Sequence, residues 1–296
     1  MALSPDGSWA AYVTTAPFRI SRAPTAGSIT LVSLRGATSC SIAVGGGAPR
    51  GLRWSPRGET LAFLAPLDGE NRVWYSAPCD SVAQPLPARD SLGGGVLAFA
   101  WSPTGTSIAY LAAEADPNAP GNDSTAPAPR IVLFRDAPGD FTGPTSPGYR
   151  RDSTGAYLAM AALNADTAEV VSRHVVSAEA RPTLDWSSTG ELLISGAPIG
   201  VSWWTMITTR QLDTFDPGAR AMRRVQEGKL ERRSPRWSPS GRRIGYMGYR
   251  VYPENSRRLE FFALQVEDPR RPTAAVEDRA FADQGEDEGD GRRARG

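Results

Sequence analysis

Few residues in this 296-residue sequence could do chemistry. His174 is the only histidine, so a Ser-His-Asp hydrolase site in this chain would have to use it as the base. Because His174 stands in an apolar, strand-like run, a structural role is favoured over catalysis. The Gly-x-Ser sequences at residues 105–107 and 200–202 lack the second glycine of a nucleophile elbow. The sequence therefore predicts no catalytic residue in this chain.

Metal and cofactor signatures are equally thin. Cys40 and Cys79 are too few and too far apart for a zinc site built on cysteine pairs. The glycine triplets at residues 45–47 and 93–95 precede strand-like runs rather than the helix that a phosphate cradle needs. We predict no metal and no cofactor. For the cysteines, two buried free thiols are favoured over one disulfide, which would need an oxidising compartment.

Aromatic and basic residues offer candidates for binding a partner rather than for catalysis. An irregular Gly- and Pro-containing stretch at residues 137–149 carries two aromatics, two adjacent tryptophans lie on a predicted strand, and residues 220–236 form a basic patch. Exposed aromatics and arginines often anchor partners. The candidate partner-binding residues are Phe141, Tyr149, Trp203, Trp204, Arg223 and Arg224. Ordinary packing for the tryptophans and a solvated loop for the arginines are the competing interpretations.

A short cassette, Trp-Ser-Pro-x-Gly in its strongest form, recurs along the chain ahead of an apolar run. Four copies carry the tryptophan, at Trp54, Trp101, Trp186 and Trp237, and two weaker copies lie at residues 3–7 and 151–155. The closing glycines are Gly7, Gly58, Gly105, Gly155, Gly190 and Gly241. Successive differences between these numbers are 51, 47, 50, 35 and 51. Repeats of about 40 to 50 residues are typical of propeller blades.

Each cassette predicts a hairpin turn between two strands. Proline pre-sets the backbone at the second turn position and glycine takes the positive φ angle at the end. The remaining residues of each repeat suffice for two more strands, and a four-stranded blade must stack against its neighbours to bury both faces. We therefore predict an all-β fold, a β-propeller of about six four-stranded blades. The four tryptophans are predicted to pack between blades.

The repeated Trp-Ser-Pro-x-Gly followed by an Ile-Ala-Tyr or Leu-Ala-Phe strand resembles the propeller repeat of TolB, the periplasmic Tol-Pal component. It equally resembles the propeller domains of prolyl oligopeptidase and dipeptidyl peptidase relatives. The resemblance covers the chain to about residue 276, which we take as the propeller domain. It implies a WD-like blade and leaves the site undefined, because the motif reports blade packing and turn chemistry.

The ends and loops of the chain lie outside the repeats. Only three residues precede the first Ser-Pro-x-Gly turn, so the ring is expected to be incomplete unless residues 279–282 supply the missing strand. A fragment of a longer protein is the favoured interpretation. Residues 277–296 are expected to form a disordered charged tail, and residues 112–130 a disordered loop. The start lacks a secretory signal, which leaves a periplasmic or a cytoplasmic location in a bacterium.

Two functional hypotheses follow. The net charge of +1 gives no global field for nucleic acid, and no apolar stretch reaches membrane-spanning length. The first hypothesis is a non-catalytic, TolB-like module that binds a protein or peptide through its loops or central channel. The alternative is the substrate-gating propeller of a prolyl oligopeptidase-family serine peptidase whose hydrolase domain is missing from this chain. A downstream Gly-x-Ser-x-Gly with Asp and His would favour the peptidase.

Overall fold

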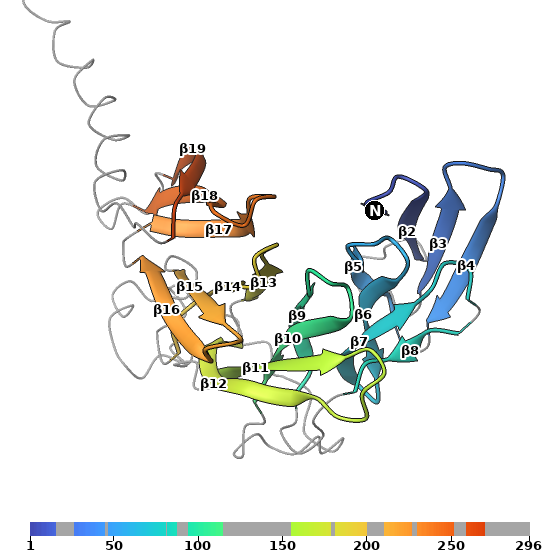
Figure 1. Cartoon of the computed structure of the whole chain (residues 1–296), viewed down its shortest axis with the longest axis horizontal. Coiled ribbons are helices and arrows are strands. Elements are labelled where there is room, and N and C mark those ends of the chain that lie inside the picture. Colours follow the sequence, from blue (N-terminus) through green and yellow to red (C-terminus); the bar gives the residue numbers. More distant parts are fainter. Residues whose placement is uncertain are drawn as a thin grey trace, which may run out of the picture.

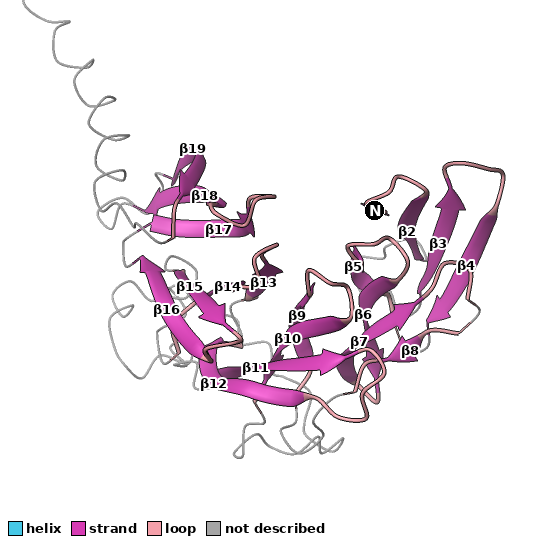
Figure 2. Ribbon diagram, in the orientation of Figure 1, coloured by secondary structure: helices cyan, strands magenta, loops and turns pink. Residues whose placement is uncertain are grey.

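The fold is described from a computed structural model of the chain. It covers residues 1–15, 27–44, 47–80, 82–87, 94–114, 155–178, 181–199, 210–226, 230–251 and 259–269. These residues form strands and turns and include no helix (Figure 2). The prediction of an all-β chain is therefore confirmed for the part that is described.

The strands assemble into four sheets of four strands and one of three. The first contains β1 (Ala2–Leu3), β2 (Trp9–Thr15), β3 (Gly27–Ser33) and β4 (Ser39–Val44). The second contains β5 (Arg50–Trp54), β6 (Leu61–Leu67), β7 (Glu70–Ser76) and β8 (Gln84–Pro85). The third contains β9 (Val96–Trp101), β10 (Ser107–Ala113), β11 (Gly155–Ala162) and β12 (Glu169–Ser177). The fourth contains β13 (Thr183–Trp186), β14 (Leu192–Gly196), β15 (Gln211–Asp216) and β16 (Ala221–Gln226). The fifth contains β17 (Leu230–Trp237), β18 (Ile244–Val251) and β19 (Leu259–Glu267).

Within each sheet the strands pair antiparallel in chain order, and the sheets follow one another around a common centre as propeller blades (Figure 1). The N-terminus and strands β5, β9, β13 and β17 lie toward that centre, whereas β4, β12 and β16 lie on the outside. The predicted propeller blades are therefore present, and the innermost strand of each blade is the one that ends at a cassette.

The hairpin turns form as predicted at five of the six cassettes. Gly7, Gly58, Gly105, Gly190 and Gly241 all have φ between +66° and +100°. Each of these glycines donates its backbone N–H to the carbonyl of the cassette serine, at 2.8 to 3.2 Å. The serine hydroxyl accepts a second backbone N–H across the turn, as from Ser107 to Ser102 at 3.1 Å. Serine recurs at this position because its hydroxyl closes the turn.

The sixth cassette is different. Gly155 does not have a left-handed φ and begins β11. This strand pairs residue by residue with β10, from Ala113 opposite Ala156 to Ser107 opposite Ala162. The cassette at residues 151–155 therefore precedes the third strand of the third sheet, and the prediction that it opens another blade is wrong. Ala112 and Ala113, assigned to a disordered loop, also belong to β10.

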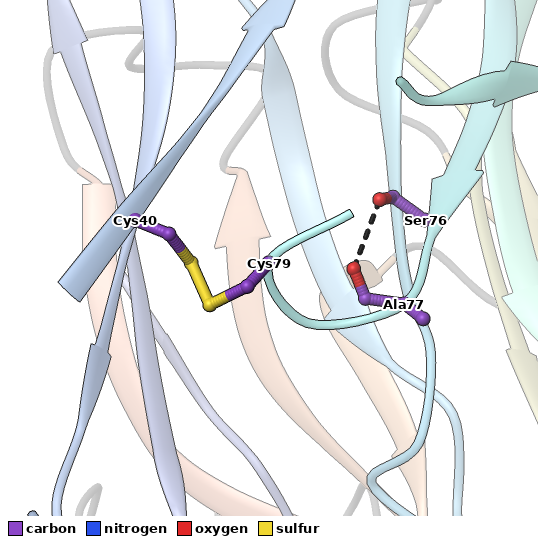
Figure 3. Close-up of a disulfide and its surroundings, with 4 residues drawn as sticks. All are labelled: Cys40, Ser76, Ala77 and Cys79. Atoms are coloured by element: carbon purple, nitrogen blue, oxygen red, sulfur yellow. Dashed lines mark hydrogen bonds between the residues drawn. A yellow bond between two sulfur atoms is a disulfide. The ribbon is translucent and has the colours of Figure 1, made fainter. Parts of the chain in front are cut away.

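The cysteines also differ from expectation. Cys40 on β4 and Cys79 in the turn after β7 form a disulfide with Cα atoms 5.5 Å apart, and Ser76 donates to the carbonyl of Ala77 at 3.0 Å in the same turn (Figure 3). The preference for free thiols is wrong because the outer edge of the first sheet lies against the second sheet. By the chain-entropy argument, closing a loop of this length stabilises the fold by about 4 kcal/mol.

The apolar core lies in the seams between neighbouring sheets. Residues of the first and second sheets share one cluster, and residues of the second and third sheets share another. The third and fourth sheets, and the fourth and fifth, are joined in the same way. Trp54, Trp101 and Trp237 are at most 9% exposed in these clusters, whereas Trp186 is half-buried. Each blade thus depends on its neighbours to bury its faces.

Candidate central binding site

The innermost strands bring three charged residues toward the centre of the propeller. Arg53 on β5, Asp185 on β13 and Arg236 on β17 each come directly before a cassette tryptophan. Neighbouring side chains on a strand point to opposite sides. The charged residue and the tryptophan of each pair therefore lie on opposite faces of the innermost strand, and all three charged residues line the same cavity.

This central cavity has a volume of about 410 Å³. It is lined from all five sheets, by Ala2, Leu3, Pro5, Arg53, Trp54, Ala100, Trp101, Asp185, Trp186 and Arg236. Three of these residues are charged, and the others are apolar or aromatic. A hollow with apolar walls and a few convergent polar groups is the usual form of a ligand site.

Asp185 is held by its neighbours in the fifth sheet. Its Oδ2 accepts the backbone N–H of Trp237 at 2.8 Å. Its Oδ1 lies 3.6 Å from Nη1 of Arg236. The carboxylate is mostly buried, whereas the Arg236 side chain is 54% exposed. Asp185 therefore holds the backbone of Trp237 and pairs with the guanidinium of Arg236, which also lines the cavity.

Arg53 is the more buried of the two arginines. Its Nη1 donates to the carbonyl of Leu184 at 3.2 Å, and its Cζ lies 5.7 Å from the ring centroid of Phe99. The pKa of Arg53 is lowered to about 10, mainly by burial and also by the like charge of Arg236, while the carboxylate of Asp185 acts in the opposite direction. The guanidinium remains protonated at neutral pH and is under-solvated.

A second cavity of about 290 Å³ lies on the cassette-turn side, between the second and third sheets. Most of its lining residues have polar side chains; they are Ser55, Arg57, Glu59, Thr60, Thr104, Gly105, Thr106, Ala162, Leu163 and Asn164. In the described part of the chain no group of three or more His, Cys, Asp or Glu side chains is placed to hold a metal ion.

Most of the sequence-predicted binding residues fall outside the described residues. This holds for Phe141, Tyr149, Trp203 and Trp204. For His174 the backbone lies on β12, but its side chain is not among those described. Only Arg223 and Arg224 can be placed.

Both of these arginines lie on β16, the outer strand of the fourth sheet. Nε of Arg224 contacts Oδ1 of Asp213 at 2.5 Å. Nη1 of Arg223 donates to the carbonyl of Pro269 at 2.5 Å. The basic patch predicted at residues 220–236 therefore does not form one surface. Arg223 and Arg224 lie on the outside of a blade, whereas Arg236 lines the central cavity.

The charged residues of the central cavity were not identified as site residues from the sequence. A signal was present, since Ala2, Arg53, Ala100, Asp185 and Arg236 occupy one position of the cassette in five copies. In a propeller, one position of a repeat maps to one ring around the axis. Three charges at that position mark the ring that faces the channel.

Comparison with solved structures supports the fold. The chain is similar to an acylaminoacyl peptidase bound to a peptide chloromethyl ketone, at 12% identity and a TM-score of 0.53, covering 88% of this chain and 37% of that one. A prolyl endopeptidase matches at 13% identity and 0.51, covering 85% and 32%. A protein from Agrobacterium tumefaciens assigned as TolB matches at 12% and 0.50, covering 88% and 79%.

These likenesses show the fold, a β-propeller of the TolB and prolyl oligopeptidase type, as predicted. The chain spans about a third of the length of the two peptidases. No protein-family model and no curated protein matches the sequence. Among the described residues there is also no helix with the length and apolar character to cross a bilayer.

Proposed function

We propose that this chain is a non-catalytic β-propeller module that binds a peptide or protein segment in its central cavity. One observation carries the proposal: the innermost strands of all five described sheets line a single hollow with apolar walls and three convergent charges. Because the walls come from backbone-paired strands, the site is formed before the ligand arrives, which lowers the entropic cost of binding.

We further propose a compartment for this binding module, and its disulfide supports the proposal. Cys40 and Cys79 join the first two blades, and structural disulfides persist in oxidising compartments. We place the working protein in such a compartment, which agrees with a periplasmic interaction role. Labelling of thiols in the protein taken directly from cells would find both cysteines blocked until a reductant is added.

The peptidase alternative shares the same cavity and differs in what surrounds the chain. A gating propeller would admit peptides to a hydrolase domain encoded in the same gene. The gene sequence on both sides of this segment distinguishes the two. A Gly-x-Ser-x-Gly segment with Asp and His partners would replace the module proposed here with a gating domain.

The binding proposal is tested by selecting peptides from a random display library against the immobilised chain. Leu3 lines the cavity and is 58% exposed. Leu3→Trp should fill the hollow without disturbing the core. Leu34 is 53% exposed and does not line the cavity, so Leu34→Trp is the matched control.

Peptides selected on the parent should bind Leu34→Trp with unchanged affinity and lose binding to Leu3→Trp. The measurement is fluorescence anisotropy with each labelled peptide. Equal binding to both variants would move the site away from the central cavity, and a library that yields no binding sequence would overturn the proposed function.

A further inference from the structure

We propose that the central cavity recognises a carboxylate of the bound peptide, held between the guanidinium groups of Arg53 and Arg236. This inference rests on the peptide-binding function proposed above and names the chemistry of its ligand.

The cavity carries a net positive charge. Its charged lining residues are Arg53, Arg236 and Asp185, and its remaining lining residues are uncharged. Two guanidinium groups against one carboxylate give a formal excess of one positive charge. In a partly buried site this charge acts through a lower dielectric than water and attracts an anion more strongly than a surface arginine would.

The one acidic group is already engaged. Both oxygens of Asp185 face the fifth sheet, one accepting from the backbone of Trp237 at 2.8 Å and the other 3.6 Å from Arg236. A ligand ammonium would have to displace these partners. Asp185 therefore acts as a positioning residue for Arg236 rather than as a contact for a cationic ligand.

Arg53 has donor capacity to spare. A guanidinium carries five N–H groups, and Arg53 uses Nη1 for the carbonyl of Leu184. No carboxylate among the described residues forms an ion pair with it. A carboxylate accepts two parallel N–H groups from one arginine, which is the strongest pairing that this side chain forms.

The lowered pKa of Arg53 also supports the binding of an anion in this cavity. Its pKa is lowered, first by burial and then by the like charge of Arg236. Both effects disfavour the charged form, and an anion placed between the arginines would offset both. A buried, under-compensated charge in a cavity is the expected signature of a site awaiting a counter-charge.

The balance of charge favours a carboxylate over a phosphate. A monoanion neutralises the net charge of the cavity, whereas a phosphate dianion would leave an excess negative charge beside the buried Asp185. The apolar side chains of Leu3 and Pro5 line the same cavity, and they can cover the residue that carries the carboxylate. An acidic side chain and a peptide C-terminus both supply this group.

The test uses pools of random pentapeptides and equilibrium dialysis of the full chain, with retained peptides identified by mass spectrometry. Four pools separate the two sources of carboxylate: with or without Asp and Glu, each with a free or an amidated C-terminus. A fifth, phosphoserine-containing pool is added. We expect retention of carboxylate-bearing peptides and none of the amidated, acid-free pool.

Variants then assign the recognition to named residues, with dissociation constants measured for one retained peptide. Arg53→Gln and Arg236→Gln should each weaken binding about tenfold or more. Arg242→Gln, an exposed arginine in the turn after β17, is the control and should change nothing. Arg236→Gln keeps the test valid if Arg53→Gln fails to fold, because the Arg236 side chain is half exposed.

The outcomes separate this inference from the function on which it rests. Equal retention of all pools, with no effect of the arginine variants, overturns carboxylate recognition and leaves peptide binding intact. Preferential retention of phosphoserine peptides also overturns it. Retention of no pool overturns both.

Discussion

The seam between the second and third sheets and the seam between the third and fourth use the same cassette differently. Trp101 is 7% exposed and donates its indole N–H to the carbonyl of Arg53 in the preceding sheet at 3.0 Å. Trp186 is half-buried and donates instead to Gly190 in its own turn, also at 3.0 Å. The same residue thus bridges two blades in one place and closes its own hairpin in the other.

The turns differ in the same sense. A Cβ on Gly105 would lie 3.4 Å from the proline ring of Pro56, so the third turn rests on the second. Gly190 has nothing within 4 Å of the corresponding position. The cassette hairpin at Gly190 therefore forms without contact from a neighbouring turn. Stacking on the preceding turn, as at Gly105, contributes to stability separately from the formation of the hairpin.

The seam between the third and fourth sheets is closed at its far end. Ser177 donates its backbone N–H to the carbonyl of Ala197 at 2.9 Å, and Gln211 reaches the carbonyl of Val175 at 3.0 Å. Gly196 lies so near Val176 that a Cβ there would be 2.8 Å from the valine Cβ. A blade can thus be fixed to its neighbour either beside the cassette or away from it.

The largest effect is expected from the tryptophans. Trp101→Ala should lower the free energy of unfolding by about 3–5 kcal/mol, because it empties a buried seam and removes a hydrogen bond between blades. Trp186→Ala should cost about 1–2 kcal/mol, since the side chain is half-buried and its partner lies in its own turn. Urea unfolding followed by tryptophan fluorescence and circular dichroism measures both. Equal losses would mean that the two seams do not differ.

An intermediate loss of stability is expected in the seam between the third and fourth sheets, at the end away from the cassette. Gly196→Ala should destabilise the protein by about 1–3 kcal/mol, because the new methyl group meets Val176 and one strand must shift. In a Val176→Gly background the loss should shrink, because the Cβ and both methyl groups that the new methyl would meet are gone. The exposed Gly36, with its nearest atom 3.9 Å away, supplies Gly36→Ala as the control. Additive losses in the double variant would argue against this contact.

The smallest effect concerns the cassette turn at the first seam, where a Cβ on Gly58 would lie 3.1 Å from Oδ1 of Asp6. The hydroxyl of Ser4 donates to Asp6 at 2.6 Å and, with the Ser8 hydroxyl and backbone N–H, lowers the pKa of the carboxyl from 3.8 to about 2. A lowered pKa in an acid stabilises the folded state above the unfolded pKa, and this contribution is lost as pH falls from about 4 to 2.

Asp6→Asn should therefore flatten the fall of the melting temperature over that pH range. The effect is small because Asp6 is exposed and screened by solvent. Thermal melts of the parent and the variant at several pH values between 2 and 5 measure it. Parallel curves would show that the turn does not favour the ionised carboxyl.

Much of this fold could be predicted from the sequence because its signals are local. A four-residue turn sequence, Ser-Pro-x-Gly in four copies and Ser-Ser-Thr-Gly at residues 187–190, acts through local backbone preferences, and all five of these turns form as predicted. The segment before Gly155 resembled a sixth turn because Tyr157 to Met160 is an apolar run like those that follow the other cassettes. Whether such a strand is the second or the third of its sheet depends on the strands with which it pairs. A local sequence pattern does not identify those strands.

The disulfide and the central site could not be predicted for the same reason. Cys40 and Cys79 are 39 residues apart, and only the stacking of two sheets brings them together. Arg53, Asp185 and Arg236 each look like an ordinary charged residue before a tryptophan. Their convergence depends on the curvature of the whole array, although their shared place in the cassette holds the clue.

The indole hydrogen bonds between blades give the array a direction. Trp54 donates to the carbonyl of Ala2 at 3.2 Å and Trp101 to that of Arg53 at 3.0 Å, so in both cases the donor follows its acceptor in the chain. Synthesis releases the N-terminal part first. The blades that carry Trp54 and Trp101 therefore each find the acceptor carbonyl already synthesised. This order suits folding of the blades one after another in chain order during translation.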